Sequence, residues 1–375
     1  MFFGVVGIGQ AGNNLADDFA KINYPAIAIN FSSSDLNSLE HVPNKLTLVG
    51  SEGVGKQRSR AMELMENNWE STIEFIKQKF NQPSIEIILV AFSTGGGTGS
   101  GISPFIIELL QEQMPDKIIC ACPILPDHSE MVGSQINTQE ALEDLSQLNI
   151  CTLPLDNQSV IKMANERVPK NILFKEINST FVEFISKIDS YTTKNSKNGV
   201  VDKRDIAQLF STKGIMVISE TNIADISDFK LDNNHFIDKI QESWKKSIFA
   251  PVQYEQIMRA GVIFDGDESL LKYLRYENLF DTFKHSPIEL YEGYYSDDKG
   301  KVITILSGLD WIYNRIKSID EIIEKGKERI NTVEVSAYKS KNTNKVALFE
   351  SITKSNTTVI PKKRSVSEMI NKYKR

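Results

Sequence analysis

Glycine residues crowd into one short stretch of this chain. From Gly95 to Gly101 the sequence GGGTGSG places five glycines among seven residues. A glycine in a regular element costs about 0.5–1 kcal/mol relative to alanine, so a cluster this dense indicates a place where side chains would obstruct a contact. The apolar run IEIILVAF precedes the cluster, and ISPFIIELLQEQ follows it with helical spacing. A strand, a glycine loop and a helix start in this order present backbone N–H groups to an anion, most often phosphate.

Two further glycine loops also follow apolar runs. Gly7–Gly12 (GIGQAG) has the G-x-G-x-x-G spacing of dinucleotide-binding loops, but the next apolar run ends in Asn30, where an adenine-ribose site needs an acid. Gly50–Gln57 (GSEGVGKQ) approaches the P-loop pattern, although Gln57 replaces the hydroxyl that holds Mg²⁺ and Glu52 adds a negative charge. For each loop by itself, a tight structural turn is the alternative. A nicotinamide-dependent enzyme stays open as an alternative at this point.

Composition restricts the class of protein. With 41% hydrophobic and 25% charged residues, the 375-residue chain is typical of a soluble globular protein. Its apolar runs stay below the roughly 18 residues that a membrane span requires. The N-terminal MFFGVVGIG has no basic residues before its apolar stretch, which favours a first strand over a signal peptide and predicts a cytoplasmic protein. Cys120 and Cys122, on one expected strand, are interpreted as buried thiols.

Strand and helix patterns alternate from residue 3 to residue 155, which predicts an α/β fold with a doubly wound, mainly parallel sheet. One long helix is expected over residues 57–80 and another over 168–191. Ligands of such folds bind at the carboxyl ends of the strands, and each glycine loop follows a strand. The predicted division comprises a nucleotide-binding domain, a central helix with a following loop, a smaller α+β domain, and a C-terminal helix with a tail; the respective residues are 1–167, 168–205, 206–308 and 309–375.

Charge is unevenly distributed along the chain. The net charge is −6, yet residues 361–375 (PKKRSVSEMINKYKR) hold six Lys or Arg residues against one Glu. A basic terminal segment on an acidic body indicates a separate contact with an anionic partner. A purely solubilising role for the segment is the alternative, and composition alone does not decide between the two.

The order of the glycine loops resembles one protein family. GGGTGSG at 95–101 is similar to the signature of the tubulin/FtsZ superfamily, and Gly9-Gln10-Ala11-Gly12 resembles the GQxG start of tubulins. Asn14 matches the asparagine of the corresponding FtsZ motif. The resemblance extends to about residue 310. It implies a GTPase that binds GTP and GDP together with Mg²⁺. The resemblance points to no protein side chain as a ligand of this ion.

The resemblance also implies which residues contact the nucleotide. Backbone groups of the three glycine loops, with two hydroxyls, would surround the phosphates: Gly9, Gln10, Ala11, Asn14, Gly53, Gly55, Gly95, Gly96, Gly97, Thr98, Gly99 and Ser100. Lys56 is close enough in sequence to approach the terminal phosphate, although the family position does not require it.

At the sugar and the base, the resemblance points to four more residues. Glu130 matches the acid that contacts ribose, although Ser134 replaces the arginine that the family has four residues later. Asn157, in LPLDNQSV, and the pair Phe174 and Asn178 match the guanine-binding positions. Phe174 and Asn178 are four residues apart and therefore share a helix face. Plain core packing is the alternative for Phe174.

Hydrolysis requires carboxylates that the glycine loops lack. The segment VVDKRDIAQLF resembles the FtsZ catalytic loop, with Asp202 and Asp205 in the places of its two acids and Val200 where the family has asparagine. In the family these acids act on the nucleotide of the neighbouring subunit. Such a head-to-tail contact does not close on itself, so it generates a filament, a homopolymer in which GTPase activity depends on assembly. A solvated loop is the alternative for both acids.

Within the superfamily the chain looks most like TubZ, the tubulin of plasmid and phage partition systems. The GSEGVGK and GGGTGSG loops, the helix from Asp310 and the basic end carry this likeness. It implies a bacterial host and a filament that moves DNA indirectly, through a DNA-binding adaptor held by residues 361–375, without a membrane partner. An FtsZ-like division protein and a phage-centring tubulin are the alternatives.

Overall fold

The computed structural model describes residues 1–164, 168–223, 233–297 and 300–332, and Met1–Glu328 pack as one compact unit. An 11-stranded sheet runs through this unit. Its strands are β1 Phe3–Ile8, β2 Ala26–Asn30, β3 Asn44–Thr47, β4 Ile87–Ser93, β5 Ile118–Leu125, β6 Cys151–Thr152, β7 Leu155–Asp156, β8 Gly214–Asn222, β9 Arg259–Asp265, β10 Glu289–Tyr295 and β11 Lys301–Leu309. The path across the sheet is β10-β9-β11-β8-β6-β5-β4-β1-β2-β3, with β7 paired to β5.

The first half of the sheet is parallel. β1 pairs with both β2 and β4, β2 with β3, and β4 with β5, so that their carboxyl ends share one edge. Phe3–Ile8 and Ile87–Phe92 are buried along their whole length. Strands that are apolar on both faces are typical of a parallel sheet covered by helices on both sides. The predicted doubly wound α/β fold is confirmed.

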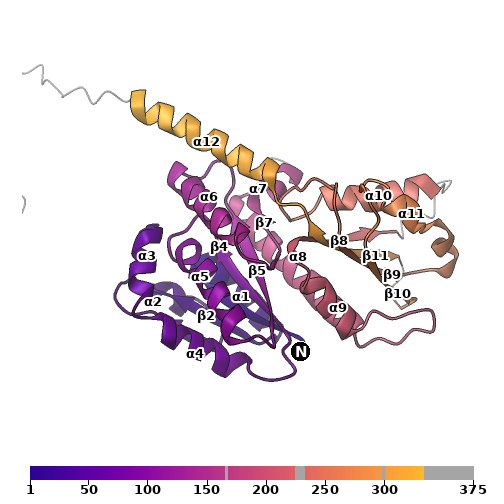
Figure 1. Ribbon diagram of the computed structural model, residues 1–375, viewed down its shortest axis with the longest axis horizontal. Coiled ribbons are helices and arrows are strands. Elements are labelled where there is room, and N and C mark those ends of the chain that lie inside the picture. The colour runs from indigo at the N-terminus through magenta and orange to yellow at the C-terminus, as the bar shows by residue number, and fades with distance from the viewer. Residues whose placement is uncertain (165–167, 224–232, 298–299, 333–375) are drawn as a thin grey trace, which may run out of the picture. The chain divides into compact units, whose positions relative to one another are not determined.

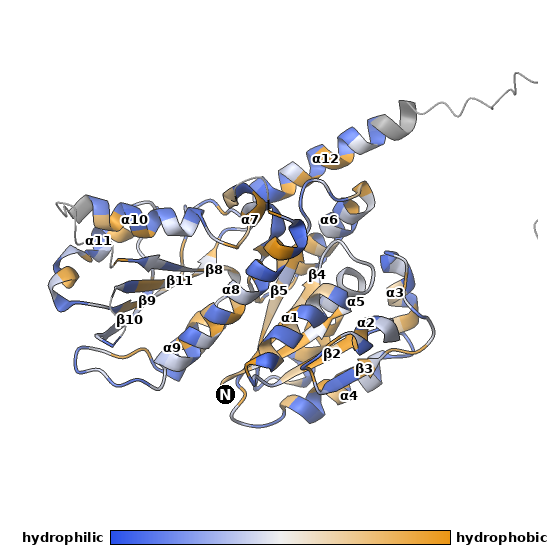
Figure 2. Ribbon diagram, turned by 180° about the vertical axis from the view of Figure 1, so that it is seen from behind, coloured by the Kyte–Doolittle hydropathy of each residue, from blue (hydrophilic) through white to orange (hydrophobic). Residues whose placement is uncertain are grey.

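Helices enclose this half of the sheet. They are α1 Gly9–Lys21, α2 Ser33–Asn37, α3 Arg58–Met65, α4 Trp69–Phe80, α5 Thr98–Gln113, α6 Val132–Ser146, α7 Asn157–Met163 and the long α8 Lys170–Tyr191. α1 packs on α8 through an edge-to-face contact between Phe19 and Phe181, with ring centroids 6.0 Å apart. In Figure 2 the strands are mainly hydrophobic, and polar residues colour the exposed sides of the helices.

The second half of the sheet is mixed. β8 pairs antiparallel with β11, β11 antiparallel with β9, and β9 parallel with β10. The helices that follow α8 along the chain are α9 Lys203–Phe210, α10 Asn233–Lys245, the 3₁₀ helix η2 Glu268–Tyr273, α11 Tyr276–Leu279 and α12 Tyr313–Thr332, of which α12 packs back on the first half through Gln139 and Asp156. Figure 1 shows α8 and α9 crossing between the two halves. Because β6 pairs with β8, the sheet itself is continuous, and the predicted boundaries between domains stay a prediction.

Two details differ from the sequence predictions. The expected helix over 57–80 is two helices, because the Asn68 side chain bonds Val49 N (2.8 Å) and Leu64 O (2.7 Å) at the break between them. The strand β10 escaped prediction, since ELYEGYY lacks a strong apolar pattern. Cys120 and Cys122 are buried thiols, as expected. None of the described helices is long and apolar enough to cross a membrane.

At the carboxyl edge of the sheet, glycine occupies positions where the backbones of neighbouring elements approach each other closely. A Cβ on Gly12 would lie 2.0 Å from the carbonyl oxygen of Ala91, and one on Gly7 would lie 2.5 Å from the oxygen of Gly12. α1 therefore lies directly against β1 and β4. Asn13 fixes the same helix to β2, because its amide bonds both the N–H (3.1 Å) and the carbonyl (3.3 Å) of Ile29.

We expect Gly12→Ala to lower the free energy of unfolding by about 3 kcal/mol or more, because the new methyl overlaps a backbone carbonyl that cannot move independently. Gly133→Ala is the matched control. It lies in α6 with nothing within 4 Å of its Cβ position, and alanine is favoured in a helix by roughly 1 kcal/mol. Urea denaturation of the nucleotide-free protein measures both changes. Equal midpoints for the two variants would contradict the close approach.

Candidate nucleotide-binding site

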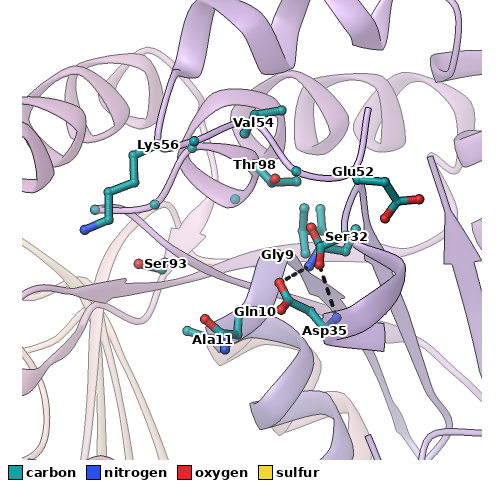
Figure 3. Close-up of a pocket in the computed structure, with 18 of the residues that line it drawn as sticks. Gly9, Gln10, Ala11, Ser32, Asp35, Glu52, Val54, Lys56, Ser93 and Thr98 are labelled. Atoms are coloured by element: carbon teal, nitrogen blue, oxygen red, sulfur yellow. Dashed lines mark hydrogen bonds between the residues drawn. The ribbon is translucent and has the colours of Figure 1, made fainter. Parts of the chain in front are cut away.

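A cavity of about 390 Å³ opens at the carboxyl edge of the parallel strands. The loops that follow β1, β2, β3, β4 and β5 all contribute to its lining (Figure 3). The lining includes eleven of the residues that the sequence singled out: Gly9, Gln10, Ala11, Gly53, Gly55, Gly95, Gly96, Gly97, Thr98, Gly99 and Glu130. Three glycine loops that are far apart in the sequence therefore meet around one space.

Two helix N-termini face this cavity. α1 begins at Gly9 and α5 at Thr98, and both residues line the cavity. Neither Ile8 nor Gly97, the residues before them, caps the helix with a side chain, and neither first turn contains an acid. The first N–H groups of a helix lack partners within the helix and carry a partial positive charge. Two uncapped helix ends beside each other form a site suited to phosphate.

The GGGTGSG loop supplies backbone more than side chains. Thr98 lines the cavity, whereas Ser100 is fully buried, donates its hydroxyl to the carbonyl of Gly96 and is not part of the lining. A Cβ on Gly97 would lie 2.8 Å from the Cα of Lys56 and 2.9 Å from the nitrogen of Gln57. Glycine at this position thus lets the second loop pack directly on the third.

Asn137, on α6, joins these two loops and was not identified from the sequence. Its amide nitrogen lies 2.9 Å from the carbonyl oxygen of Lys56, 3.1 Å from that of Gly96 and 3.3 Å from that of Gly95. Because these three carbonyl groups face Asn137, the backbone N–H groups of the two loops can face the other way, toward the cavity. A single asparagine in a polar helix gives no local sequence signal of such a contact.

Carboxylates line the rest of the cavity. Asp35 accepts a hydrogen bond from the amide of Asn30 (3.0 Å), and Glu52 accepts one from the hydroxyl of Ser33 (2.8 Å). Burial raises the pKa of Glu130, and the nearby charge of Asp127 raises it further. Within the described parts of the chain, no three His, Cys, Asp or Glu side chains gather as a metal cluster.

The residues predicted to hold the base lie outside this cavity. Asn178, on α8, donates to Asp18 of α1 at 3.1 Å, and burial raises the pKa of the Asp18 carboxyl. Asn14, which was expected at the phosphates, is exposed on α1 one turn before Asp18 and is not among the residues that line the cavity. Phe174 is partly buried and packs against the hydrophobic core, so both interpretations of this ring stay open.

Asn157 begins α7 and is buried beside an ion pair that the sequence did not reveal. Asp156, which caps α7, pairs with Arg315 of α12 at 3.1 Å, and both side chains are almost fully buried. Arg315 also donates to the carbonyl of Pro126, just after β5. This pair connects α12 to the edge of the sheet that carries Asn157. Removing either partner would leave an uncompensated buried charge, which is strongly destabilising.

Asp202 and Asp205 lie away from the cavity. Asp202 caps α9, and the Asp205 side chain accepts from the Asp202 N–H at 2.9 Å in a reciprocal capping box. Next to them, Arg204 pairs with Glu86 at 3.1 Å and the Lys203 amine lies 5.6 Å from the Phe2 ring centroid. Residues 2 and 86 precede β1 and β4, whereas the cavity lies where these strands end. The acids are therefore at the opposite end of the same strands.

Fold and site together indicate a class of protein: a doubly wound α/β protein whose glycine loops and helix N-termini form a cavity suited to the phosphates of a nucleotide. Comparison with known families makes this specific. Residues 3–165 match the Tubulin/FtsZ family, GTPase domain. Over these residues the chain is thus similar to the GTPase domain of the tubulin/FtsZ family, and GTP hydrolysis is the activity that this domain implies. The match favours GTP over a nicotinamide cofactor.

Relatives cover most of the chain. The tubulin-like protein CetZ of Pyrococcus horikoshii is 26% identical over 335 residues, which are 85% of this chain and 87% of CetZ. The tubulin-like protein TubZ of Clostridium botulinum C phage is 28% identical over 324 residues, 84% of this chain and 81% of TubZ. A GTPγS-form protofilament structure of Bacillus thuringiensis serovar israelensis TubZ has a TM-score of 0.75 at 19% identity, covering 89% of this chain and 95% of that one.

We expect Asn137→Ala to weaken GTP and GDP binding to a similar extent, roughly 10-fold or more, since releasing three carbonyls lets both phosphate loops move. Titration with fluorescent nucleotides below the concentration for assembly measures both affinities. Gln139→Ala, an exposed amide on the same helix, is the control and should bind like wild type. Unchanged affinities in Asn137→Ala would show that the loops hold their shape without it.

Proposed function

We propose that this protein is a filament-forming GTPase in which each subunit's GTP is hydrolysed with the help of Asp202 and Asp205 from its neighbour. The observation that carries the proposal is the position of these acids at the opposite end of β1 and β4 from the phosphate cavity. Strands of six and seven residues separate the two sites by roughly 20 Å, at about 3.3 Å per residue. Neither carboxylate reaches the cavity of its own chain.

A head-to-tail contact brings the two ends together. The amino end of the sheet of one subunit would face the carboxyl edge of the next, and because such a contact is heterologous it propagates into a filament. The Bacillus thuringiensis TubZ structure is that of a protofilament, which supports this arrangement. The capping box of α9 is compatible with a catalytic role. It occupies one oxygen of each carboxylate, and a carboxylate has about four acceptor positions with which to orient a water.

Within the subunit, the chain binds and orients the nucleotide. The uncapped N-termini of α1 and α5 would hold the phosphates, Glu130 the ribose, and Asn157, Phe174 and Asn178 the guanine. Asp18, bonded to Asn178, is a further acceptor at the base end. Bound Mg²⁺ would neutralise part of the phosphate charge. Asp35 and Glu52, whose oxygens suit this ion, would hold it together with phosphate and water.

Asp205→Asn tests the role of the neighbour's acids. The amide oxygen can still accept from Asp202 N–H, so α9 keeps its cap while the negative charge is lost. We expect GTP turnover to fall by about 100-fold or more with nucleotide affinity nearly unchanged, and the filaments to persist. Phosphate release and sedimentation measure these effects. Asp238→Asn, the same chemical change on an exposed part of α10, is the control. Wild-type turnover in Asp205→Asn would exclude the proposed role of this acid.

The partner of the filament is a separate proposal. The relatives comprise both CetZ and TubZ proteins, so they support the filament-forming class more directly than a role in plasmid or phage partition. The feature that favours partition is the basic segment 361–375, which lies outside the described residues. Its six positive charges suit the phosphates of DNA carried by an adaptor protein.

Deleting residues 361–375 should leave assembly intact and remove the association of the filaments with DNA. Co-sedimentation of adaptor-bound duplex DNA with filaments at about 50 and 200 mM salt measures the contact, which should weaken steeply with salt because it releases counterions. A truncated chain that still carries DNA would refute the tail as the contact. Loss of filaments on truncation would show that the segment belongs to the polymer interface.

A further inference from the structure

The loop that leads to the two acids lies along the outermost strand of the mixed half of the sheet. Residues 192–202 connect α8 to α9, and β10 ends the path of strands on this side. The Tyr294 N–H donates to the carbonyl of Gly199 at 3.1 Å, and the Ser196 hydroxyl donates to the carbonyl of Tyr294. The middle of the loop is therefore bonded to the main chain of β10 before the chain reaches Asp202.

One tyrosine of β10 reaches the residue next to the first acid. Tyr295 is 4% exposed, and its hydroxyl oxygen accepts a hydrogen bond from the N–H of Val201 at 3.1 Å. The same hydroxyl donates to the carbonyl of Tyr191, the last residue of α8, at 3.4 Å. A tyrosine hydroxyl has one proton to donate and can accept at the same time. Tyr295 thus joins the end of α8 to the main chain immediately before Asp202.

Two glycines make room for this contact. A Cβ on Gly293 would lie 2.7 Å from the Cε2 atom of Tyr295 and 3.1 Å from the Cγ2 atom of Val201. Residues 293 and 295 are two apart in a strand and share one face, so glycine at the first lets the ring of the second lie back over it. Gly199 has a φ of 126°, and its Cβ position is 3.3 Å from the Tyr294 ring. Glycine inside a strand often marks such a close approach.

Packing and charge keep the tyrosine in place and protonated. The ring centroids of Tyr191 and Tyr295 are 4.9 Å apart, and the Tyr191 hydroxyl donates to Asp265 at 2.7 Å. Burial raises the pKa of Tyr295, and the negative charges of Asp205 and Asp265 raise it further, against a smaller lowering by the bond from Val201. The phenol is therefore neutral at physiological pH and keeps the proton that it donates to the end of α8.

We propose that Tyr295 is a positioning residue for GTP hydrolysis, which holds the main chain at Val201 so that the neighbouring subunit receives Asp202 and Asp205 in one arrangement. The inference rests on the proposed function of these two acids. Because the Asp205 carboxylate is bonded to the Asp202 N–H, a shift of the chain at Val201 would displace both carboxylates together. Tyr295 is buried within its own subunit, so it acts through the acids and does not touch the nucleotide.

Tyr295→Phe removes the hydroxyl and keeps the ring. We expect turnover per assembled subunit to fall by roughly 10-fold or more, because a misplacement of about 1 Å can cost about 100-fold in rate. The affinity of the free subunit for GTPγS should stay close to wild type, since the cavity lies at the other end of β1 and β4. Hydrogen exchange of the Val201 N–H should become faster. Phosphate release divided by sedimented polymer, nucleotide titration and exchange measured on the free subunit give the three results.

Tyr254→Phe is the matched control. Tyr254 also donates its hydroxyl to a main-chain carbonyl, that of Trp244 at 2.6 Å, and its contacts lie away from the loop 192–202. Its loss should lower the thermal midpoint about as much as Tyr295→Phe does and leave turnover per assembled subunit at the wild-type value. If Tyr295→Phe does not fold, Gly293→Ala decides, because its methyl would displace the Tyr295 ring and should slow turnover in the same way.

Replacing both acids separates positioning from a structural role. In a chain with Asp202→Asn and Asp205→Asn, the groups that Tyr295 would position are absent, so adding Tyr295→Phe should slow the residual turnover by less than about 2-fold. A further loss as large as that of Tyr295→Phe alone would overturn the proposal. Wild-type turnover in Tyr295→Phe, or an equal loss in Tyr254→Phe, would overturn it too. Wild-type turnover in the chain without the two acids would instead refute the proposed function.

Discussion

Backbone packed directly on backbone at the carboxyl edge of the sheet is the constraint from which the site follows. Gly12 lies against the carbonyl of Ala91, and Gly97 lies against the loop that carries Lys56. At both positions a Cβ would overlap main-chain atoms. Because these contacts are so close, the starts of α1 and α5 lie side by side with their N–H groups uncapped. The affinity for phosphate is thus a property of main-chain geometry, and side chains adjust it.

Much of this could be predicted from the sequence, because a parallel sheet gathers its strand ends along one edge and glycine loops at that edge suit a bound anion. The alternation of apolar runs and helical segments predicts such a sheet. Gly9, Gly53 and Gly95 could therefore be expected to meet, and they line one cavity. The distance of Asp202 from that cavity was implied by the family resemblance alone, since no local pattern relates its loop to the ends of β1.

The features that the sequence did not reveal are contacts between side chains and distant parts of the chain. Asn137 reaches carbonyls some 40 and 80 residues earlier, and Arg315 reaches Asp156 across 159 residues. Periodicity reports which face of a helix is apolar, but it carries no information about which polar group a given amide meets. The helix break at Asn68 has the same cause, because tertiary bonds to Val49 outweigh the local preference. The nucleotide contacts assigned to Phe174 and Asn178 stay predictions, because the helical periodicity does not report which group these side chains meet.

Because the phosphate cavity and the two acids lie at opposite ends of the subunit, one chain alone would hold an incomplete hydrolytic site. Turnover of GTP per subunit, measured across a dilution series together with light scattering, tests this most directly. We expect turnover per subunit to be close to zero at concentrations where scattering shows no polymer, and to rise as filaments form. A turnover per subunit that stays constant through the whole series, down to isolated chains, would contradict the shared site.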